Sequence, residues 1–418
     1  MLRQIEGSQA VARAVALCRP EVISAYPFSP QTHIVEGLSD MVRTGELDPC
    51  EYLMVESEFG AMSACIGASA AGARTYTATS SQGLLFMAEA LYNASGLGLP
   101  IVMTLANRAI GAPINIWNDH SDAMSQRDSG WIQLYAESNQ EAVDLHIQAF
   151  RLAERLSLPV MVCMDGFVLT HAVERIEVPD QEQVDAFLPT FEPRQMLDPA
   201  DPVSIGAMVG PEAFTEVKYL MHAKQVQALD EIPRIATDFE EIFGRAAGGL
   251  LRSYRTEDAE TVVVALGSLL GTIEEVVDTM REEGIRIGAL DVKCFRPWPI
   301  NEVREALAGA SRVIVVEKAF AVGAGGIVGQ NTRLALSGTP TTVYNIVAGL
   351  GGRPVTRKSL RGLFDDVLEN RLEPNHLHFL DLNRELVERE LERSISGRPG
   401  PHAESMLREL GSVGSGSH

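Results

Sequence analysis

Short apolar runs alternate with longer amphipathic stretches through the first 170 residues of the chain. The β-type runs are residues 22–25, 52–55, 75–79, 101–105 and 160–164. Helical patterns lie between them, at residues 57–71, 83–95 and 140–156. Because strands that are each followed by a helix pair in parallel, this alternation predicts a doubly wound α/β layer. Ligands are expected at the polar turns that end the strands.

A second α/β rhythm follows a weaker middle segment. Proline- and acid-rich loops between residues 177 and 238 lead into a helical stretch at 213–229. The later β-type runs are residues 261–266, 287–292, 312–317 and 342–346. We therefore expect a first domain with a trailing connecting segment over 1–250 and a second α/β domain over 258–383. Residues 384–418 are charged and then rich in glycine and serine, which predicts a terminal helix and a flexible tail.

Composition narrows the class of protein. The chain has 45% apolar residues and a net charge of −21, from 56 acidic and 35 basic residues. This balance disfavours nucleic acid and anionic membranes as partners, since both require a positive surface. No apolar run reaches the roughly 20 residues that span a bilayer, and the first 21 residues are typical of an amphipathic helix, not of a signal peptide. We expect a cytoplasmic protein.

The five cysteines are scattered, and no two of them have a CxxC spacing. Such a pattern supports neither a zinc site nor an iron–sulfur cluster held by this chain, so no metal is expected in it. The pattern favours reduced thiols that are buried as small apolar groups. Neither GxGxxG nor GxxxxGK[ST] occurs, which excludes the usual glycine-rich loops for dinucleotides and phosphates.

Several strand ends carry candidate chemistry, although each also has an ordinary structural explanation. Ser29 follows the first strand in Tyr-Pro-Phe-Ser-Pro, a rigid turn that could equally cap the next helix. Glu58 opens a helix of small residues, where spacing alone favours an acid that stabilises the helix N-terminus by about 0.3–1 kcal/mol. Ser81 and Gln82 lie in a polar loop suited either to a ligand or to capping. Arg108 could bind a carboxylate through its planar fork, or simply pack.

Taken together, these segments resemble the alpha subunit of the four-subunit type of pyruvate:ferredoxin oxidoreductase and its 2-oxoacid relatives. The similarity runs in order from about residue 1 to residue 370, and the block 106–142 is its longest part. The matching segments are YPFSPQT (26–32), VESEFGAMSA (55–64), TSSQGL (79–84), residues 106–142, MDGFVLTH (164–171), VKCFRPWP (292–299) and YNIVAGLGGRPVT (344–356).

The resemblance implies a thiamine-diphosphate-binding fold of the pyrimidine type, followed by a domain like the transketolase C-terminal domain. It assigns Glu58 as the glutamate that binds the pyrimidine ring of thiamine diphosphate and promotes its activation. Pro27, Ser81 and Gln82 are implied to line the cofactor beside it. Arg108 is implied to grip the substrate carboxylate together with Ser29, which stands where many pyruvate enzymes carry threonine.

Four further residues, Asn118, Asp119, His120 and Arg127, match the same block and are expected to shape the pocket or a subunit seam. His120 also lies between two aspartates and could act as a ligand or a base, or could hold the loop together by hydrogen bonds. Serine lacks the methyl group of the threonine that many pyruvate enzymes carry at this position. The identity of the 2-oxoacid is therefore less firmly implied than the type of reaction.

The resemblance also implies partners and a reaction. The beta subunit would hold the diphosphate and its Mg²⁺, the beta and delta subunits would carry [4Fe-4S] clusters, and a gamma subunit would complete the enzyme. The reaction implied is oxidative decarboxylation of a 2-oxoacid, pyruvate first, with CoA as co-substrate and electrons passing to ferredoxin or an NAD-linked acceptor.

Other functions are compatible with the sequence. Phenylglyoxylate dehydrogenase and oxidoreductases of 2-oxoglutarate, branched-chain 2-oxoacids or oxalate would share the mechanism. A non-catalytic assembly subunit would keep only the fold, but it would need neither Glu58 nor Arg108. Likeness of fold alone would not choose between these functions.

Overall fold

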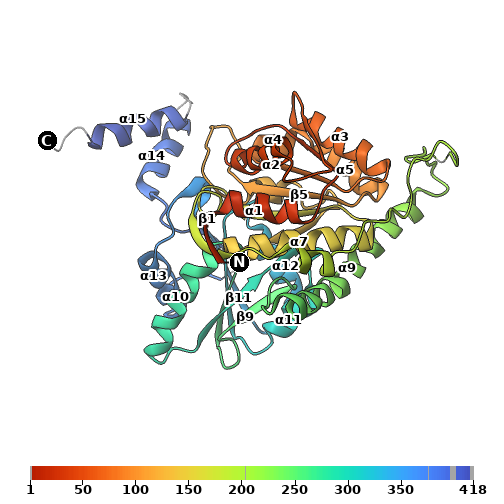
Figure 1. The fold of residues 1–418 in the computed structure, drawn as a ribbon. Helices are drawn as coiled ribbons and strands as arrows, with labels where there is room; N and C mark the ends of the chain where they lie inside the picture. Colours follow the sequence, from red (N-terminus) through yellow and green to blue (C-terminus); the bar gives the residue numbers. More distant parts are fainter. Residues whose placement is uncertain (1, 203, 375, 396–401, 415–418) are drawn as a thin grey trace.

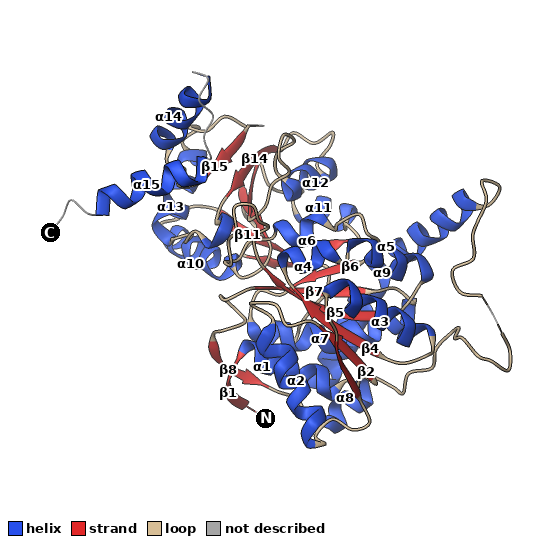
Figure 2. Cartoon of the chain, turned by 90° about the horizontal axis from the view of Figure 1, so that it is seen from above, coloured by secondary structure: helices blue, strands red, loops and turns tan. Residues whose placement is uncertain are grey.

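Two sheets with helices on their faces make up the body of the molecule (Figures 1 and 2). The structure is a computed structural model and describes residues 2–202, 204–374, 376–395 and 402–414. Figure 2 shows the red strands of both sheets running through the middle of the molecule with blue helices around them. This arrangement confirms the predicted α/β class.

The first sheet has seven strands in the order β12-β6-β7-β5-β4-β2-β3. Its strands are β2 (Val22–Ala25), β3 (Glu51–Met54), β4 (Thr75–Thr79), β5 (Ile101–Asn107), β6 (Ile132–Tyr135), β7 (Val160–Asp165) and β12 (Cys294–Arg296). All neighbours pair in parallel except β12 and β6. The central strands β4, β5 and β7 are buried along their whole length, because helices cover both faces of a doubly wound sheet.

Seven helices accompany this sheet, and most of them follow a strand directly. They are α1 (Gly7–Leu17), α2 (Thr32–Thr44), α3 (Glu58–Ala70), α4 (Ser81–Phe86), α5 (Ala88–Leu97), α6 (Ser121–Ser125) and α7 (Asn139–Leu156). The helix predicted at 83–95 is two helices, since α4 ends at Phe86 and α5 begins at Ala88.

The N-terminus departs from the amphipathic helix that the sequence predicts. Leu2–Glu6 forms β1, which pairs antiparallel with β8 (Val173–Glu177), and α1 begins only at Gly7. A Cβ atom at Gly7 would lie 2.2 Å from the carbonyl oxygen of Leu169. The close contact of the two segments therefore requires glycine at the point where the strand turns into the helix.

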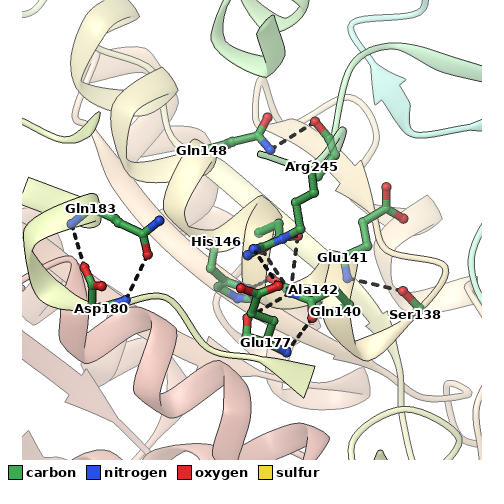
Figure 3. Close-up of polar contacts among 12 residues, drawn as sticks. Ser138, Gln140, Glu141, Ala142, His146, Gln148, Glu177, Asp180, Gln183 and Arg245 are labelled. Carbon is green, nitrogen blue, oxygen red and sulfur yellow. Dashed lines mark hydrogen bonds and ion pairs between the residues drawn. The ribbon is translucent and has the colours of Figure 1, made fainter. Parts of the chain in front are cut away.

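Helix α7 connects the first sheet to segments far along the chain, as Figure 3 shows. The Gln140 side chain forms hydrogen bonds with both the backbone N–H and the carbonyl oxygen of Glu177 in β8. Gln148 donates to the carbonyl oxygen of Ala247, and Arg245 forms a two-point ion pair with Asp144 at 2.6 and 2.9 Å. These contacts hold the segment between the two sheets against the first layer.

That segment contains α8 (Gln181–Phe187) and the long helix α9 (Phe214–Phe243). The helix predicted at 213–229 continues through Pro233, because its second half packs on the core through Ile235, Phe239 and Phe243. Figure 2 shows the first turns of α9 projecting from the body together with the loop that precedes them.

The second sheet has six strands in the order β15-β14-β13-β10-β11-β9. They are β9 (Leu251–Tyr254), β10 (Thr261–Ala265), β11 (Ile287–Val292), β13 (Arg312–Glu317), β14 (Thr342–Val347) and β15 (Leu377–Phe379). Its helices are α10 (Leu269–Glu282), α11 (Ile300–Ala306), α12 (Ile327–Ala335) and α13 (Arg357–Leu368), with a short 3-10 turn, η1 (Leu350–Gly352). Strand β12 leaves this half to pair with β6, so the two halves share one sheet. The boundary near 250–258 stays a prediction.

The C-terminal region holds two helices, α14 (Arg384–Ile395) and α15 (His402–Gly414), which project from the body in Figure 1. The expected flexible tail falls on residues 415–418, outside the described part of the chain. Within the described residues, no helix has the length and apolar character needed to cross a membrane.

Candidate functional site

Glu58 is the first residue of α3, after a three-residue turn that follows β3. Its helix is capped by Ser57, whose Oγ accepts the backbone N–H of Gly60 at 3.1 Å. Glu58 is 7% exposed, whereas Glu56 faces solvent. The Glu58 side chain lies on Gly83, where an added Cβ would be 2.7 Å from Oε1. Glycine in α4 therefore makes room for this carboxylate.

The turn between β4 and α4 brings two further candidates beside Glu58. Ser81 is fully buried in a left-handed conformation, with a φ of +48°, and Gln82 is half-buried next to it. The Ser81 hydroxyl lies 2.6 Å from the carbonyl oxygen of Ala109 and also contacts Oε1 of Gln82. Thr79 Oγ1 lies 2.6 Å from the position that a Cβ on Gly83 would take. This oxygen is buried without a hydrogen-bond partner among the described residues.

Arg108 follows β5 and reaches the turn after β2. Its Nη1 donates to the carbonyl oxygen of Ser29 at 2.9 Å, and its Nε donates to that of Asn115 at 3.1 Å. The guanidinium lies 4.8 Å from the centre of the Phe28 ring. Nη2 makes no hydrogen bond to the described residues, so part of the fork remains available for a carboxylate. Burial lowers the pKa of Arg108, and the nearby Asp122 carboxylate opposes that shift.

Ser29 itself is exposed, and Pro27 is half-buried two residues earlier. The structure thus brings Ser29 and Arg108 together through the carbonyl oxygen of Ser29 and not through its hydroxyl. Glu58 lies beside the β4–α4 turn, and a hydrogen bond joins Ser81 of that turn to the strand end after β5.

The loop 118–122 turns toward the second half of the chain. Asp119 Oδ2 accepts the backbone N–H of Gly351 at 3.0 Å, and Asn118 is buried with an unpartnered Nδ2 among the described residues. His120 Nε2 lies 2.6 Å from Oδ1 of Asp165. The backbone N–H of His120 also donates to the carbonyl oxygen of Lys318 at 2.9 Å, so Asp119 and His120 lie at the seam between the two halves of this chain.

Asp165 is the centre of that seam. Lys318 Nζ lies 3.1 Å from its Oδ2, and the backbone N–H of Ser268 donates to the same oxygen at 3.1 Å. Burial alone would raise the pKa of Asp165, but the charges of Lys318 and His120 outweigh burial and hold that pKa well below its usual range. Arg127 lies elsewhere, two residues after the end of α6, where its carbonyl oxygen accepts a hydrogen bond from Nε of Arg296.

Sequence reasoning did not identify Asp122 as a functional residue. This carboxylate is completely buried and accepts four hydrogen bonds, two of them from the backbones of Ser81 and Arg108. The only signal in the sequence is a second aspartate after His120, which does not reveal its partners.

Two clusters of the described residues have the spacing of metal ligands. Glu6, His33 and His171 form one, in which Glu6 and His33 already pair at 2.7 Å. Glu137, Glu141 and Asp291 form the other, with Lys293 Nζ paired to Glu141 and 2.9 Å from Asp291. Neither cluster includes a candidate residue of the site around Glu58.

Comparison with known proteins places the chain in a family. The family described as pyruvate flavodoxin/ferredoxin oxidoreductase, thiamine diP-bdg, matches residues 13–236, and pyruvate:ferredoxin oxidoreductase core domain II matches residues 259–360. The pyruvate synthase subunit PorA of Methanosarcina barkeri is 47% identical over 92% of this chain and 97% of its own length. The ketoisovalerate oxidoreductase subunit VorA of Pyrococcus horikoshii is 39% identical over 87% of this chain and 93% of its own.

Two solved structures share the fold. A 2-oxoglutarate:ferredoxin oxidoreductase from Magnetococcus marinus has a TM-score of 0.65 at 20% identity, over 87% of this chain and 65% of that chain. A split gene transketolase has a TM-score of 0.52 at 12% identity, over 88% of this chain and 99% of that chain. At such identities the likeness concerns the fold alone, and it confirms the fold expected from the resemblance. The extent of the family matches and the identity to full-length relatives show that this chain belongs to the pyruvate flavodoxin/ferredoxin oxidoreductase family.

Proposed function

We propose that this chain is the thiamine-activating subunit of a 2-oxoacid oxidoreductase that oxidatively decarboxylates pyruvate in the presence of CoA. The observation that carries the proposal is a buried glutamate packed on a glycine turn, together with an arginine whose fork is only partly used. Relatives named pyruvate synthase subunit, such as the one from Methanosarcina barkeri, support pyruvate as the substrate.

The residues around Glu58 fit the aminopyrimidine end of thiamine diphosphate. The Glu58 carboxylate packs directly on Gly83, and the adjacent Thr79 Oγ1 is buried without a partner among the described residues. A buried polar atom of this kind usually has a partner, and a polar ring would provide one. When bound, thiamine diphosphate supplies the nucleophilic carbon and the electron sink for loss of CO₂.

Glu58 would hold a proton at a pyrimidine ring nitrogen, in a position from which water is largely excluded. Arg108 would orient the 2-oxoacid by binding its carboxylate through Nη2, while Nη1 and Nε stay anchored to the carbonyl oxygens of Ser29 and Asn115. Anchoring two of the three nitrogens fixes the direction of the third.

A partner subunit would complete the site. Large apolar side chains near Glu58 are exposed, including Met54 at 69%, Phe59 at 39% and Phe86 at 59%. The rings of Phe59 and Phe86 lie 6.3 Å apart, so they form a common surface. Exposed apolar surface of this kind marks contact with another protein. We propose that the beta subunit covers this apolar surface and binds the diphosphate end of the cofactor and its Mg²⁺.

The remaining partners are needed because the electrons released by the reaction must pass to iron–sulfur clusters in other subunits. Its five cysteines are free, and all except Cys50 are buried. We therefore assign the [4Fe-4S] clusters to the beta and delta subunits, with gamma completing the enzyme and ferredoxin or an NAD-linked subunit accepting electrons. We also propose a cytoplasmic location, where such unpaired thiols are usual.

The test is viologen reduction by the intact complex, purified with its partner subunits and supplied with CoA. Pyruvate, 3-methyl-2-oxobutanoate, phenylglyoxylate and 2-oxoglutarate would be compared by kcat/KM. We expect pyruvate to be the best of the four. Preference for the branched acid would move the chain to the branch of the ketoisovalerate relative, and no turnover by a cluster-replete complex would leave only an assembly role.

A second arm tests Arg108. Arg108→Gln should raise the KM for the 2-oxoacid roughly 10- to 150-fold, because a charge-assisted hydrogen bond is worth about 1.5–3 kcal/mol. Arg43→Gln is the matched control, since Arg43 pairs with Asp40 on the surface. An unchanged KM in Arg108→Gln would contradict the assignment.

A further inference from the structure

Two turns of the proposed site meet at one buried carboxylate, Asp122 in the first turn of α6. Its Oδ2 accepts the backbone N–H of Ser81 at 3.0 Å and the backbone N–H of Arg108 at 2.9 Å. Its Oδ1 accepts Nδ2 of Asn107 at 2.9 Å and the backbone N–H of Ala123 at 2.8 Å. Asp122 is 0% exposed. One side chain thus bridges the ends of β4 and β5.

All four partners of Asp122 are donors, which only a carboxylate can satisfy in full. Burial raises the pKa of Asp122 to about 6, and the hydrogen bonds from Asn107, Arg108, Ser81 and Ala123 oppose the rise. The group is therefore mainly ionised at neutral pH, where it accepts all four bonds.

The two backbones that Asp122 holds are those whose direction matters for the site. Ser81 adopts a left-handed conformation that a residue with a side chain rarely takes, and such a conformation persists only where its surroundings fix it. The position of the Arg108 backbone sets the position from which its side chain extends, and so the place that its guanidinium can reach. A shift of either turn would move Gln82 relative to Glu58, or would move the fork relative to Ser29.

We propose that Asp122 is a positioning residue for the reaction, which fixes the cofactor turn at Ser81 and the substrate arginine at Arg108 in one geometry. The inference rests on the proposed function, because it assigns these two turns to cofactor and 2-oxoacid. Asp122 itself touches neither group in this assignment and acts through the two backbone amides.

Asp122→Asn is the discriminating substitution. In either orientation of the amide, its NH₂ group faces two donors, either those of Ser81 and Arg108 or those of Asn107 and Ala123. We expect the KM for pyruvate to rise at least tenfold and the apparent affinity for thiamine diphosphate to fall, measured with the intact complex. The KM for CoA should stay within twofold, which a general loss of structure would not predict.

A charge-exchange variant supplies a rescue. In Asn107→Asp combined with Asp122→Asn, the new carboxylate accepts the NH₂ group of the new amide, whose oxygen then faces Ser81 and Arg108 again. Only the bond from Ala123 is lost. We expect the KM for pyruvate to return to within about threefold of the wild-type value.

Asp144→Asn is the matched control, because Asp144 is also a buried carboxylate, paired with Arg245 away from these turns. It should lower thermal stability and leave the KM for pyruvate unchanged. An assembled Asp122→Asn complex with an unchanged KM would overturn the inference. So would a charge-exchange complex that assembles without recovering, or failure of both Asp122 variants to assemble while Asp144→Asn assembles.

Arg108→Gln separates this inference from the proposed function. If Arg108→Gln raises the KM and Asp122→Asn does not, the positioning role fails and the proposed function stands. If Arg108→Gln leaves the KM unchanged, the assignment of the substrate arginine fails, and the inference fails with it.

Discussion

Asp165 joins the two halves of the chain, and its replacement should loosen them locally. The substitution Asp165→Asn keeps the size of the side chain and removes its charge. Lys318, which is 7% exposed, would then lack the counter-charge that lies 3.1 Å away in the native protein. Removal of one partner from a buried ion pair costs about 3–5 kcal/mol. Since each 1.4 kcal/mol corresponds to about a factor of ten, opening of the seam should become roughly 150- to 4,000-fold more frequent.

Hydrogen–deuterium exchange of the intact complex measures this effect where it occurs. The peptides to follow are those that contain Ser268, whose N–H donates to Asp165, and His120, whose N–H donates to the carbonyl oxygen of Lys318. Asp40→Asn is the control, because Asp40 is 69% exposed and its pair with Arg43 is worth about 0–1 kcal/mol. Equal exchange at the seam in Asp165→Asn and wild type would refute the reasoning.

The same group gives the seam a defined response to acid. Its folded pKa lies below the unfolded value of about 3.9, so the unfolded chain binds the proton more readily. The stabilisation is therefore fully present above about pH 4 and is lost progressively as the pH falls further. Wild-type protection at the Ser268 peptide should decline in this acidic window, and Asp165→Asn should lack that part of the decline.

Two further buried sites should change the thermal stability of the protein, one as the pH falls and one on substitution. Burial lowers the pKa of His146 to about 4. The neutral ring therefore contributes about 3 kcal/mol to the stability of the folded protein above pH 6.5, and this contribution is lost as the pH falls toward 4. Thermal unfolding measured against pH should show this loss in wild type and lack it in His146→Gln. Gly326→Ala would place a Cβ 2.1 Å from Oε1 of Glu317, the carboxylate that caps α12. It should therefore lower thermal stability, whereas Gly271→Ala, with no atom within 4 Å, should leave it unchanged or raise it slightly. A Gly326→Ala protein as stable as wild type would contradict the contact.

The hydrophobic pattern was sufficient for the central strands of both sheets. Runs such as 75–79 and 287–292 coincide with β4 and β11, because strands buried on both faces are rich in apolar and β-branched residues. Short strands were missed where the pattern is brief, as for β6, or where pairing decides, as for β12. The residues of β1 are exposed or half-buried, so their strand conformation depends on β8 and not on an apolar run.

The candidate residues of the site could be predicted from sequence motifs, but the hydrogen bonds and ion pairs between them could not. Glu58 and Arg108 stand in recognisable segments, and the structure places both in buried positions. The role proposed for Asp122 depends on backbone amides contributed by two other strand ends, which only the folded sheet brings together. The ion pair of Asp165 with Lys318 likewise joins residues from different halves of the chain.

The central claim is that Glu58 activates thiamine diphosphate within a complex formed with partner subunits. The most direct measurement is the rate of hydrogen–deuterium exchange at the thiazolium C2 carbon of the bound cofactor, in complexes that carry Glu58→Gln or the control Glu56→Gln. We predict a 10²- to 10⁴-fold slower exchange in Glu58→Gln, on the order of a lost acid–base group, and an unchanged rate in Glu56→Gln, whose side chain is exposed. Wild-type exchange in a Glu58→Gln complex that retains its cofactor and clusters would contradict the account.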